Sequence, residues 1–269
     1  MYDLFAHTPG WLVLVVFMVV PAAFAVAVHA VVRALVPAEK LLPHHDVAGF
    51  LVAVVGVLYA VVLGFLVISV WSGFDAAQRN ADAETNDVAE ILHLVRSMPD
   101  DTRKRERRLL GEYAYEVRDV EWPMLERTEE DLRARALMVA ALEVVASAQV
   151  PSGTPPTEAQ RQATLRTIAL ENFRELAGHR RLRILDSRSH VEPTLYFTII
   201  AGGLVLLTFV YLFGVQSRTL QFLMTALVAA MIGLMVGIIF ELDRPFWGAL
   251  HVSPHAWTLL IQDNRLGQP

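Results

Sequence analysis

Four long runs of apolar residues are separated by polar segments along the 269-residue chain. The first runs from Trp11 to Val32 and the second from Val47 to Trp71, and both are long enough to cross the hydrocarbon core of a bilayer. The third and fourth, over 193–215 and 220–240, are separated by a four-residue turn, so they form a tight hairpin. The pattern predicts four transmembrane helices in two pairs.

The segment between the two pairs is polar and compatible with helix throughout. No strong breaker follows the second apolar run before Pro99, so the second helix is expected to project beyond the membrane. Three further helices are predicted, over 102–125, 129–149 and 157–188, and Pro123 should bend or end the first of them. No part of the segment alternates as a β-strand does. The fold class predicted is an all-α membrane protein with a central helical cytoplasmic domain.

The predicted boundaries divide the chain into four parts. They are the first transmembrane pair (1–72), the cytoplasmic helical domain (73–192), the second transmembrane pair (193–242) and a cytoplasmic C-terminal tail (243–269).

Charged residues are concentrated in the predicted cytoplasmic domain. It contains 18 of the 23 Lys and Arg residues and 22 of the 28 Asp and Glu residues. An even number of spans places this domain and both termini on one side of the membrane. That side has 20 of the Lys and Arg residues, whereas the opposite loops contain only Arg33, Lys40 and Arg218. The positive-inside rule therefore favours a cytoplasmic domain and cytoplasmic termini.

Composition and motifs argue against several function classes. The net charge of −5 gives no support for nucleic-acid binding. The chain has no cysteine, which rules out a disulfide framework or a thiolate metal site. No catalytic or phosphate-binding motif is present, so neither an enzyme nor a cofactor or metal site is predicted. His29, inside the first span, is expected to face a neighbouring helix or the interface, and a place in a proton path is the alternative.

Small residues recur every four positions on the second and fourth spans, where they let another helix backbone approach closely. They are Gly56, Ala60 and Gly64 on the second span, and Ala229, Gly233 and Gly237 on the fourth. For the second span two interpretations stay open. The stripe either packs inside one subunit or packs around the symmetry axis of a homo-oligomer.

Carboxylates gather where the second helix is expected to leave the membrane. Asp75, Asp82 and Glu84 lie within ten residues of one another, with Arg79 as the only nearby cation. In a symmetric oligomer they would form rings around a pore vestibule, and rings of carboxylates attract cations. The alternative is an ordinary solvated face of the helix.

A second group of charges follows the fourth span. Glu241, Asp243 and Arg244 stand at the expected membrane boundary, where a charge is costly unless it is paired or hydrated. An ion-pair network is therefore expected, joining Glu241 or Asp243 to Arg79, or Arg244 to Glu84.

The order of two spans, a long helical domain and two spans, followed by ELDRPFWG at 241–248, resembles bestrophins and the bacterial bestrophin-like family. The stretches RNADAETND (79–87), EWP (121–123) and RRLRIL (180–185) are also similar to the bestrophin-like family. The resemblance implies a pentameric ion channel whose second transmembrane helix lines the pore with apolar side chains. By position these are Leu58, Val61, Phe65 and Ile68. WGALHVSP stands where animal bestrophins carry a calcium-binding acidic cluster, so calcium gating is not expected.

The leading hypothesis is therefore a bestrophin-like homo-oligomeric ion channel, multi-pass in the bacterial plasma (inner) membrane. Its expected partners are further copies of itself, the lipid bilayer and inorganic ions. The carboxylates near Asp82 give a slight lean toward cations. One alternative is a stator-like proton-channel or energy-transducing subunit, which shares the two-plus-two layout. The other is a non-conducting membrane scaffold or sensor.

Overall fold

The computed structural model describes residues 8–36, 45–150, 152–213 and 217–266, with only the backbone described for 45–48. Every regular element within these ranges is helical. Contacts between residues divide the chain into two compact units. The first, here called the apolar unit, comprises 1–74, 190–244 and 248–250, and the second, the polar unit, comprises 75–189, 245–247 and 251–269.

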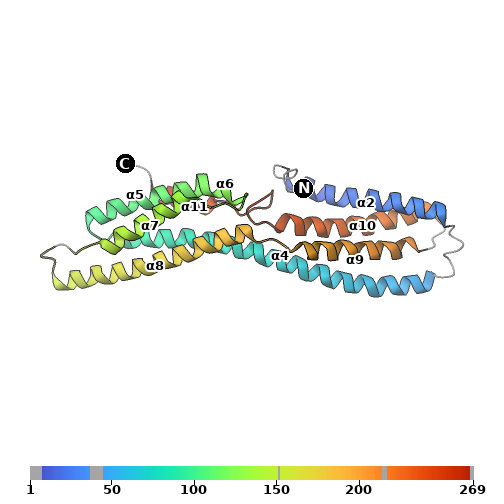
Figure 1. The fold of residues 1–269 in the computed structure, drawn as a ribbon, viewed down its shortest axis with the longest axis horizontal. Coiled ribbons are helices and arrows are strands. Elements are labelled where there is room, and N and C mark those ends of the chain that lie inside the picture. The colour runs from blue at the N-terminus through green and yellow to red at the C-terminus, as the bar shows by residue number, and fades with distance from the viewer. Residues whose placement is uncertain (1–7, 37–44, 151, 214–216, 267–269) are drawn as a thin grey trace. The chain divides into compact units, whose positions relative to one another are not determined.

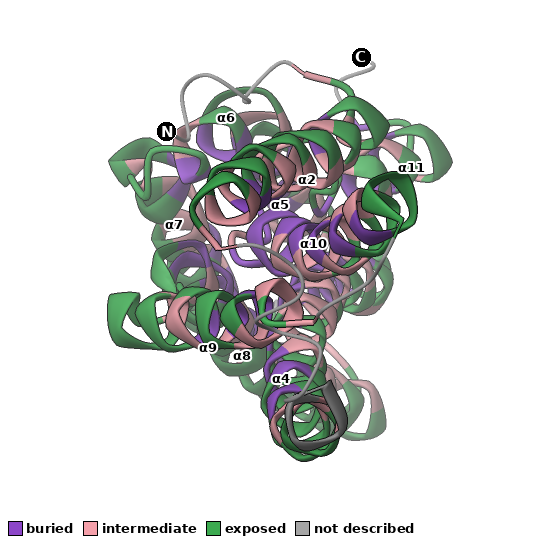
Figure 2. Cartoon of the chain, turned by 90° about the vertical axis from the view of Figure 1, so that its right-hand side faces the viewer, coloured by how far each residue is buried: buried purple, intermediate pink, exposed green. Residues whose placement is uncertain are grey.

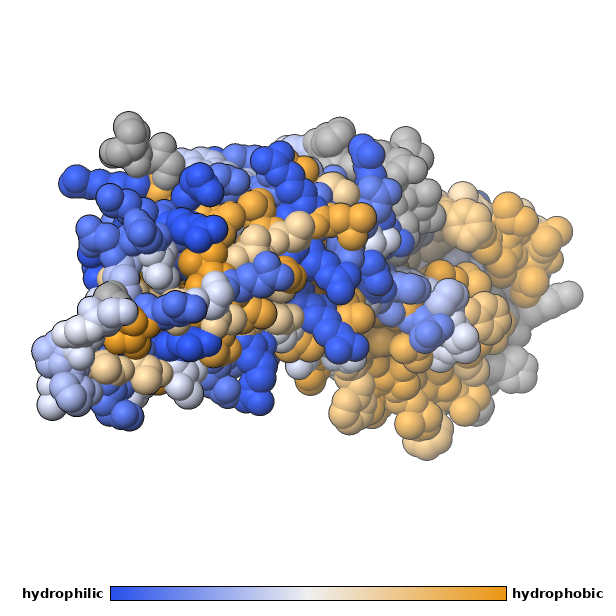
Figure 3. Space-filling model, turned by 60° about the vertical axis from the view of Figure 1, so that its left-hand side comes forward, coloured by the Kyte–Doolittle hydropathy of each residue, from blue (hydrophilic) through white to orange (hydrophobic). Residues whose placement is uncertain are grey.

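The apolar unit contains the four helices that are long and apolar enough to cross a membrane. They are α2 (Gly10–Leu35), the first half of α4 (His45–Val95), α9 (Pro193–Tyr211) and α10 (Arg218–Leu242) (Figure 1). On the face drawn in Figure 3, hydrophobic side chains cover this unit, while hydrophilic ones predominate on the polar unit. The prediction of four candidate membrane-spanning helices is confirmed, and the second of them continues to Val95 without a break.

Helices α2 and α10 pack closely because small residues and a proline meet between them. A Cβ atom added at Gly233 would overlap the carbonyl oxygen of Phe17, and one added at Gly237 would lie 2.9 Å from the Phe17 Cβ. Pro21 has no N–H, so the Phe17 carbonyl four residues earlier lacks its usual helical partner. The small residues of the fourth span thus pack against α2 of the same chain, and Ala229 is also fully buried.

His29 lies in the same α2–α10 contact. It is fully buried, and its Nδ1 lies 2.6 Å from the Thr225 Oγ1. The rings of Tyr211 and Phe222 flank the imidazole at centroid distances of 5.0 and 5.6 Å. The prediction that this histidine faces a neighbouring helix is confirmed.

Helix α4 packs one of its faces against α9 and α10. Tyr59 donates a hydrogen bond of 2.9 Å to the Ile199 carbonyl, and its ring lies against Gly202, where an added Cβ would approach the ring to 2.8 Å. One hydrophobic cluster of the unit is formed by side chains from all three helices. They are Tyr59, Leu63, Leu66 and Val70 from α4, with Ile199, Ile239 and Leu242.

The polar unit combines the second half of α4 with shorter helices. They are α5 (Asp100–Glu116), η2 (Val117–Glu121), α6 (Trp122–Leu125), α7 (Leu132–Ser147), α8 (Pro156–Arg188) and α11 (His255–Asp263). The predicted helix over 102–125 is interrupted by the π-helical turn η2. The interruption ends two residues before Pro123, which cannot donate the backbone hydrogen bond that a continuous α-helix requires.

Helix α11 lies in the C-terminal tail, for which the sequence analysis proposed no helix. Trp257, Leu260 and Ile261 are buried, and the Trp257 ring stacks edge-on against Tyr113 of α5 at 5.7 Å. Their spacing of three and four residues is an amphipathic helical pattern. The short length of the pattern and the surrounding polar residues obscured it in the sequence.

Candidate functional site

An exposed apolar face runs along α4, on the side away from its packed face. Leu58, Val61, Phe65 and Ile68 are between 50% and 71% exposed. Their spacing of three, four and three residues keeps them on one side of the helix, and we call this set the α4 stripe. Figure 2 shows exposed residues on the outer side of α4 and buried residues toward the other helices. Lipid or other protein copies must cover so apolar a surface.

The three predicted vestibule carboxylates occupy different environments. Asp75 pairs with Arg79 on the next turn of α4, and Asp82 accepts a hydrogen bond of 3.0 Å from the Gln78 Nε2. Glu84, in contrast, is fully buried in the polar unit. The fold therefore leaves Asp75 and Asp82 partly accessible and withdraws Glu84 from the surface, where a vestibule residue would have to lie.

Glu84 belongs to a buried ion cluster, which also contains Glu121, Arg180, Arg183 and Tyr113. The Arg183 Nε donates to one Glu84 oxygen at 2.5 Å, and its Nη2 donates to Glu121 at 2.5 Å. Arg180 pairs with the other Glu121 oxygen. The Tyr113 hydroxyl donates to Glu84 at 2.6 Å. Four elements, α4, α5, η2 and α8, thus meet at one set of charges.

The charges of the cluster compensate one another. Burial alone would lower the pKa of Arg183, but the carboxylates of Glu84 and Glu121 outweigh that effect and raise it. Burial, followed by the negative charge of Glu84, raises the pKa of Tyr113 well above its ordinary value, so the phenol remains a donor. Removing one partner of such a buried pair costs about 3–5 kcal/mol, because the other charge is left uncompensated. The cluster is therefore a structural device that fixes the helices of the polar unit.

The sequence analysis did not predict that these particular residues pair with one another, although the sequence contained an indication of it. The three stretches noted for their family resemblance, 79–87, 121–123 and 180–185, each contribute to the cluster. The π-helical turn directs Glu121 inward, where the backbone N–H of Asp131 also donates to it at 3.1 Å. The resemblance thus marked residues that are distant in sequence and adjacent in the fold.

Among the charged residues after the fourth span, Asp243 has hydrogen-bond partners that account for its burial. Asp243 is buried and accepts hydrogen bonds from the backbone of Val191 at 2.5 Å and from the Tyr196 hydroxyl at 3.1 Å. These bonds tie the end of α10 to the start of α9. Arg79 and Glu84, the expected partners of this group, pair with Asp75 and Arg183 respectively.

The other two residues of the expected network, Glu241 and Arg244, differ in exposure. Glu241 is buried at the end of α10, whereas Arg244 is partly exposed. Their pairing stays a prediction. Within the described ranges, no group of three or more histidine or acidic side chains could hold a metal ion.

Comparisons with known proteins agree with this architecture. A structure of a bestrophin homologue from Klebsiella pneumoniae, carrying a point mutation, aligns with a TM-score of 0.66 at 12% identity, covering 90% of this chain and 98% of that chain. A second mutant of that homologue gives 0.63 at 13% identity, covering 92% and 99%. A structure described only as a membrane protein gives 0.56 at 17% identity, again covering 92% and 99%.

At such identities the structural likeness concerns the fold. Among curated protein sequences there is no match. The family model of the Bestrophin-like domain, however, matches residues 19–257, which is most of the chain. This chain belongs to the bestrophin-like family.

Proposed function

We propose that the chain is the subunit of a homo-oligomeric ion channel of the bacterial plasma membrane, in which the α4 stripe lines the narrow part of the pore. The observation that carries the proposal is the division of α4 into two faces. One face packs on α9 and α10 of its own subunit, and the other is apolar and exposed over about three turns. Membership of the bestrophin-like family supports this assignment.

The oligomer brings several copies of the stripe around one axis. A Cβ atom added at Gly64, between Val61 and Phe65, would meet nothing within 4 Å, so the backbone there is open to close approach by another helix. A ring of apolar side chains narrows a pore and controls conduction by excluding water when it closes. We propose a pentamer, with the polar unit and both chain ends in the cytoplasm; residues 1–7 and 267–269 lie outside the described ranges.

A preference for cations is part of the proposal and rests on Asp82, with a smaller share from Asp75. Asp75 is largely compensated by Arg79, and Glu84 is neutralised inside the polar unit by Arg183. One uncompensated carboxylate per subunit would still form a ring. Its field reaches about 8 Å at physiological ionic strength.

Cysteine substitution can test the pore directly, because the chain has no cysteine of its own. Single cysteines at Leu58, Val61, Phe65 and Ile68 are expected to make reconstituted channels sensitive to a water-soluble thiol reagent. Val19→Cys on α2 is the matched control, since Val19 is an apolar residue of similar exposure on another span. Absence of current from the wild type, or equal block at Val19 and at the stripe, would contradict the assignment.

Ion preference requires a separate measurement. Asp82→Asn should shift the reversal potential in a salt gradient away from the cation value, and the shift should shrink as salt rises. Asp101→Asn, an exposed carboxylate of α5, is the control and should leave the potential unchanged. If Asp82→Asn also leaves it unchanged, the carboxylate ring does not set selectivity.

A further inference from the structure

A cavity of about 480 Å³ opens on the polar unit between α7, α8 and the turn that precedes α7. Four of its lining residues are arginines and one is a glutamate: Arg135, Arg180, Arg181, Arg188 and Glu130. Ile184 and Leu185 of α8 add an apolar wall. We call this cavity the arginine pocket. Its volume is in the range of small-molecule sites, and its lining carries an excess of positive charge.

The arginines are held in different ways. Arg180 is almost fully buried, and two hydrogen bonds fix its side chain. Its Nη2 donates to Glu121 and, at 3.0 Å, to the Asp131 carbonyl. Its Nε is buried and has no hydrogen-bond partner among the residues that the structure describes. One guanidinium in the lining of the pocket is thus pre-positioned by the fold.

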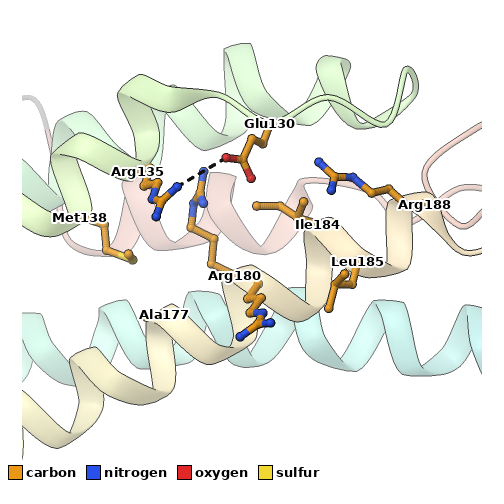
Figure 4. A pocket seen from close by; sticks show the side chains of 9 residues that line it. Glu130, Arg135, Met138, Ala177, Arg180, Ile184, Leu185 and Arg188 are labelled. Carbon is orange, nitrogen blue, oxygen red and sulfur yellow. Dashed lines mark ion pairs between the residues drawn. The ribbon is translucent and has the colours of Figure 1, made fainter.

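The remaining arginines of the pocket are exposed. The Arg188 Nε donates to the Thr128 carbonyl at 3.4 Å, and Arg135 lies 3.8 Å from the Glu130 carboxylate. Arg181 makes no ion pair with any residue in the described ranges. Figure 4 shows the side chains of Arg135, Arg180 and Arg188 directed toward the space beside Glu130. The carboxylate of Glu130 would repel an anion. Its exposed ion pair with Arg135 is weak, however, so Arg135 can exchange this partner for a ligand.

We infer that the arginine pocket binds a phosphate-bearing anion. Guanidinium groups present planar pairs of N–H donors that match the oxygens of a phosphate, and several of them around one cavity bind it bidentately. The fixed Arg180 would form the base of the site, and Arg181 and Arg188 would close over the ligand. The apolar wall at Leu185 suits a ligand with a carbon portion beside its phosphate.

Two sources can supply this chemistry. One is a soluble phosphate compound. The other is the headgroup of an anionic lipid, since α8 ends at Arg188 and the next helix, beginning at Pro193, is apolar enough to enter a membrane. The recognition chemistry is the same for both, so the experiment must separate them.

The test uses the full-length protein in detergent and two probes, pyrophosphate and phosphatidylglycerol. Arg181→Gln with Arg188→Gln removes two exposed pocket charges and spares the buried ion cluster. Arg105→Gln with Arg174→Gln is the matched control, because it removes two exposed arginines outside the pocket. Pyrophosphate binding is measured by calorimetry, and retained lipid is counted by native mass spectrometry.

Binding of either probe to the wild type and the control, weakened about tenfold or more in the pocket variant, supports the inference. A response to pyrophosphate alone identifies a soluble ligand, and a response to the lipid alone identifies a headgroup. Leu185→Glu is a second variant that keeps every arginine, and it should abolish binding by placing a carboxylate in the pocket. The inference is overturned if neither probe binds the wild type, or if control and pocket variants lose affinity equally.

Discussion

In the polar unit, the cost of burying a carboxylate depends on whether it has hydrogen-bonding or oppositely charged partners. Glu84 is bonded to Arg183 and Tyr113, so its charge is compensated. Glu106 of α5 is equally buried, but neither of its oxygens has a hydrogen-bond partner within the described residues. Burial raises the pKa of Glu106 to about 8, because the charged carboxylate would lose its hydration without compensation. Burial without a partner therefore makes Glu106 unfavourable to the folded state at neutral pH.

Glu106 should make the stability of the protein depend on pH. The native state holds its proton up to about pH 8, whereas the unfolded chain releases it near 4.5. Its contribution is thus fully present below the unfolded pKa and is lost as the pH rises through the folded one. The loss approaches about 1.4 kcal/mol per pH unit within that interval.

Glu106→Gln should remove this dependence, and the variant should unfold at a higher temperature than the wild type above pH 8. Thermal unfolding in detergent across the interval measures it. Glu112→Gln, an exposed residue of the same helix, should keep the wild-type slope. Parallel curves for Glu106→Gln and the wild type would show that Glu106 does not titrate in this range.

At the scale of elements, the contact between α2 and α10 depends on a proline and a glycine acting together. Pro21 leaves the Phe17 carbonyl without its helical donor, and Gly233 lets the α10 backbone come close to that oxygen. A Cα–H group so placed can form a weak hydrogen bond with a carbonyl. Neither residue would explain the close packing alone.

Gly233→Ala should therefore destabilise the apolar unit by about 1–3 kcal/mol, because its Cβ would overlap the Phe17 carbonyl and force the helices apart. Thermal unfolding in detergent provides the measurement. Gly178→Ala on α8 is the control, since nothing lies within 4 Å of its added Cβ and alanine favours helix more than glycine does. It should be neutral or slightly stabilising. A similar rise in unfolding temperature for both variants would refute the packing argument.

At the scale of the whole molecule, four candidate spans imply that alternate connections lie on opposite sides of the membrane. Single cysteines at Ser152, before α8, and Ser217, before α10, should label from opposite sides with a membrane-impermeant maleimide. Both serines are exposed, and the cysteine-free sequence gives each variant a single thiol. The positive-inside rule expects Ser152 on the cytoplasmic side. Labelling of both positions from the same side would exclude the proposed topology.

Much of the helical architecture was determined by the sequence itself. The length and apolarity of the four runs are local properties, and they specify membrane-spanning helices whatever their neighbours are. Helix α8 was predicted over 157–188 and extends from Pro156 to Arg188, because the Pro-rich loop before it is a strong local break. The length of α4 was likewise predictable, since nothing between Trp71 and Val95 interrupts a helix.

Tertiary structure alone decided which face of each helix has which role. Both faces of the membrane part of α4 are apolar, so no periodicity in the sequence separates the buried Tyr59 and Leu66 from the exposed Leu58 and Phe65. Likewise, Asp82 and Glu84 are near neighbours in sequence, yet only Glu84 meets Arg183, which is 99 residues away. A pairing of charges depends on distances through the folded chain, and these arise only when α4, α5 and α8 pack together.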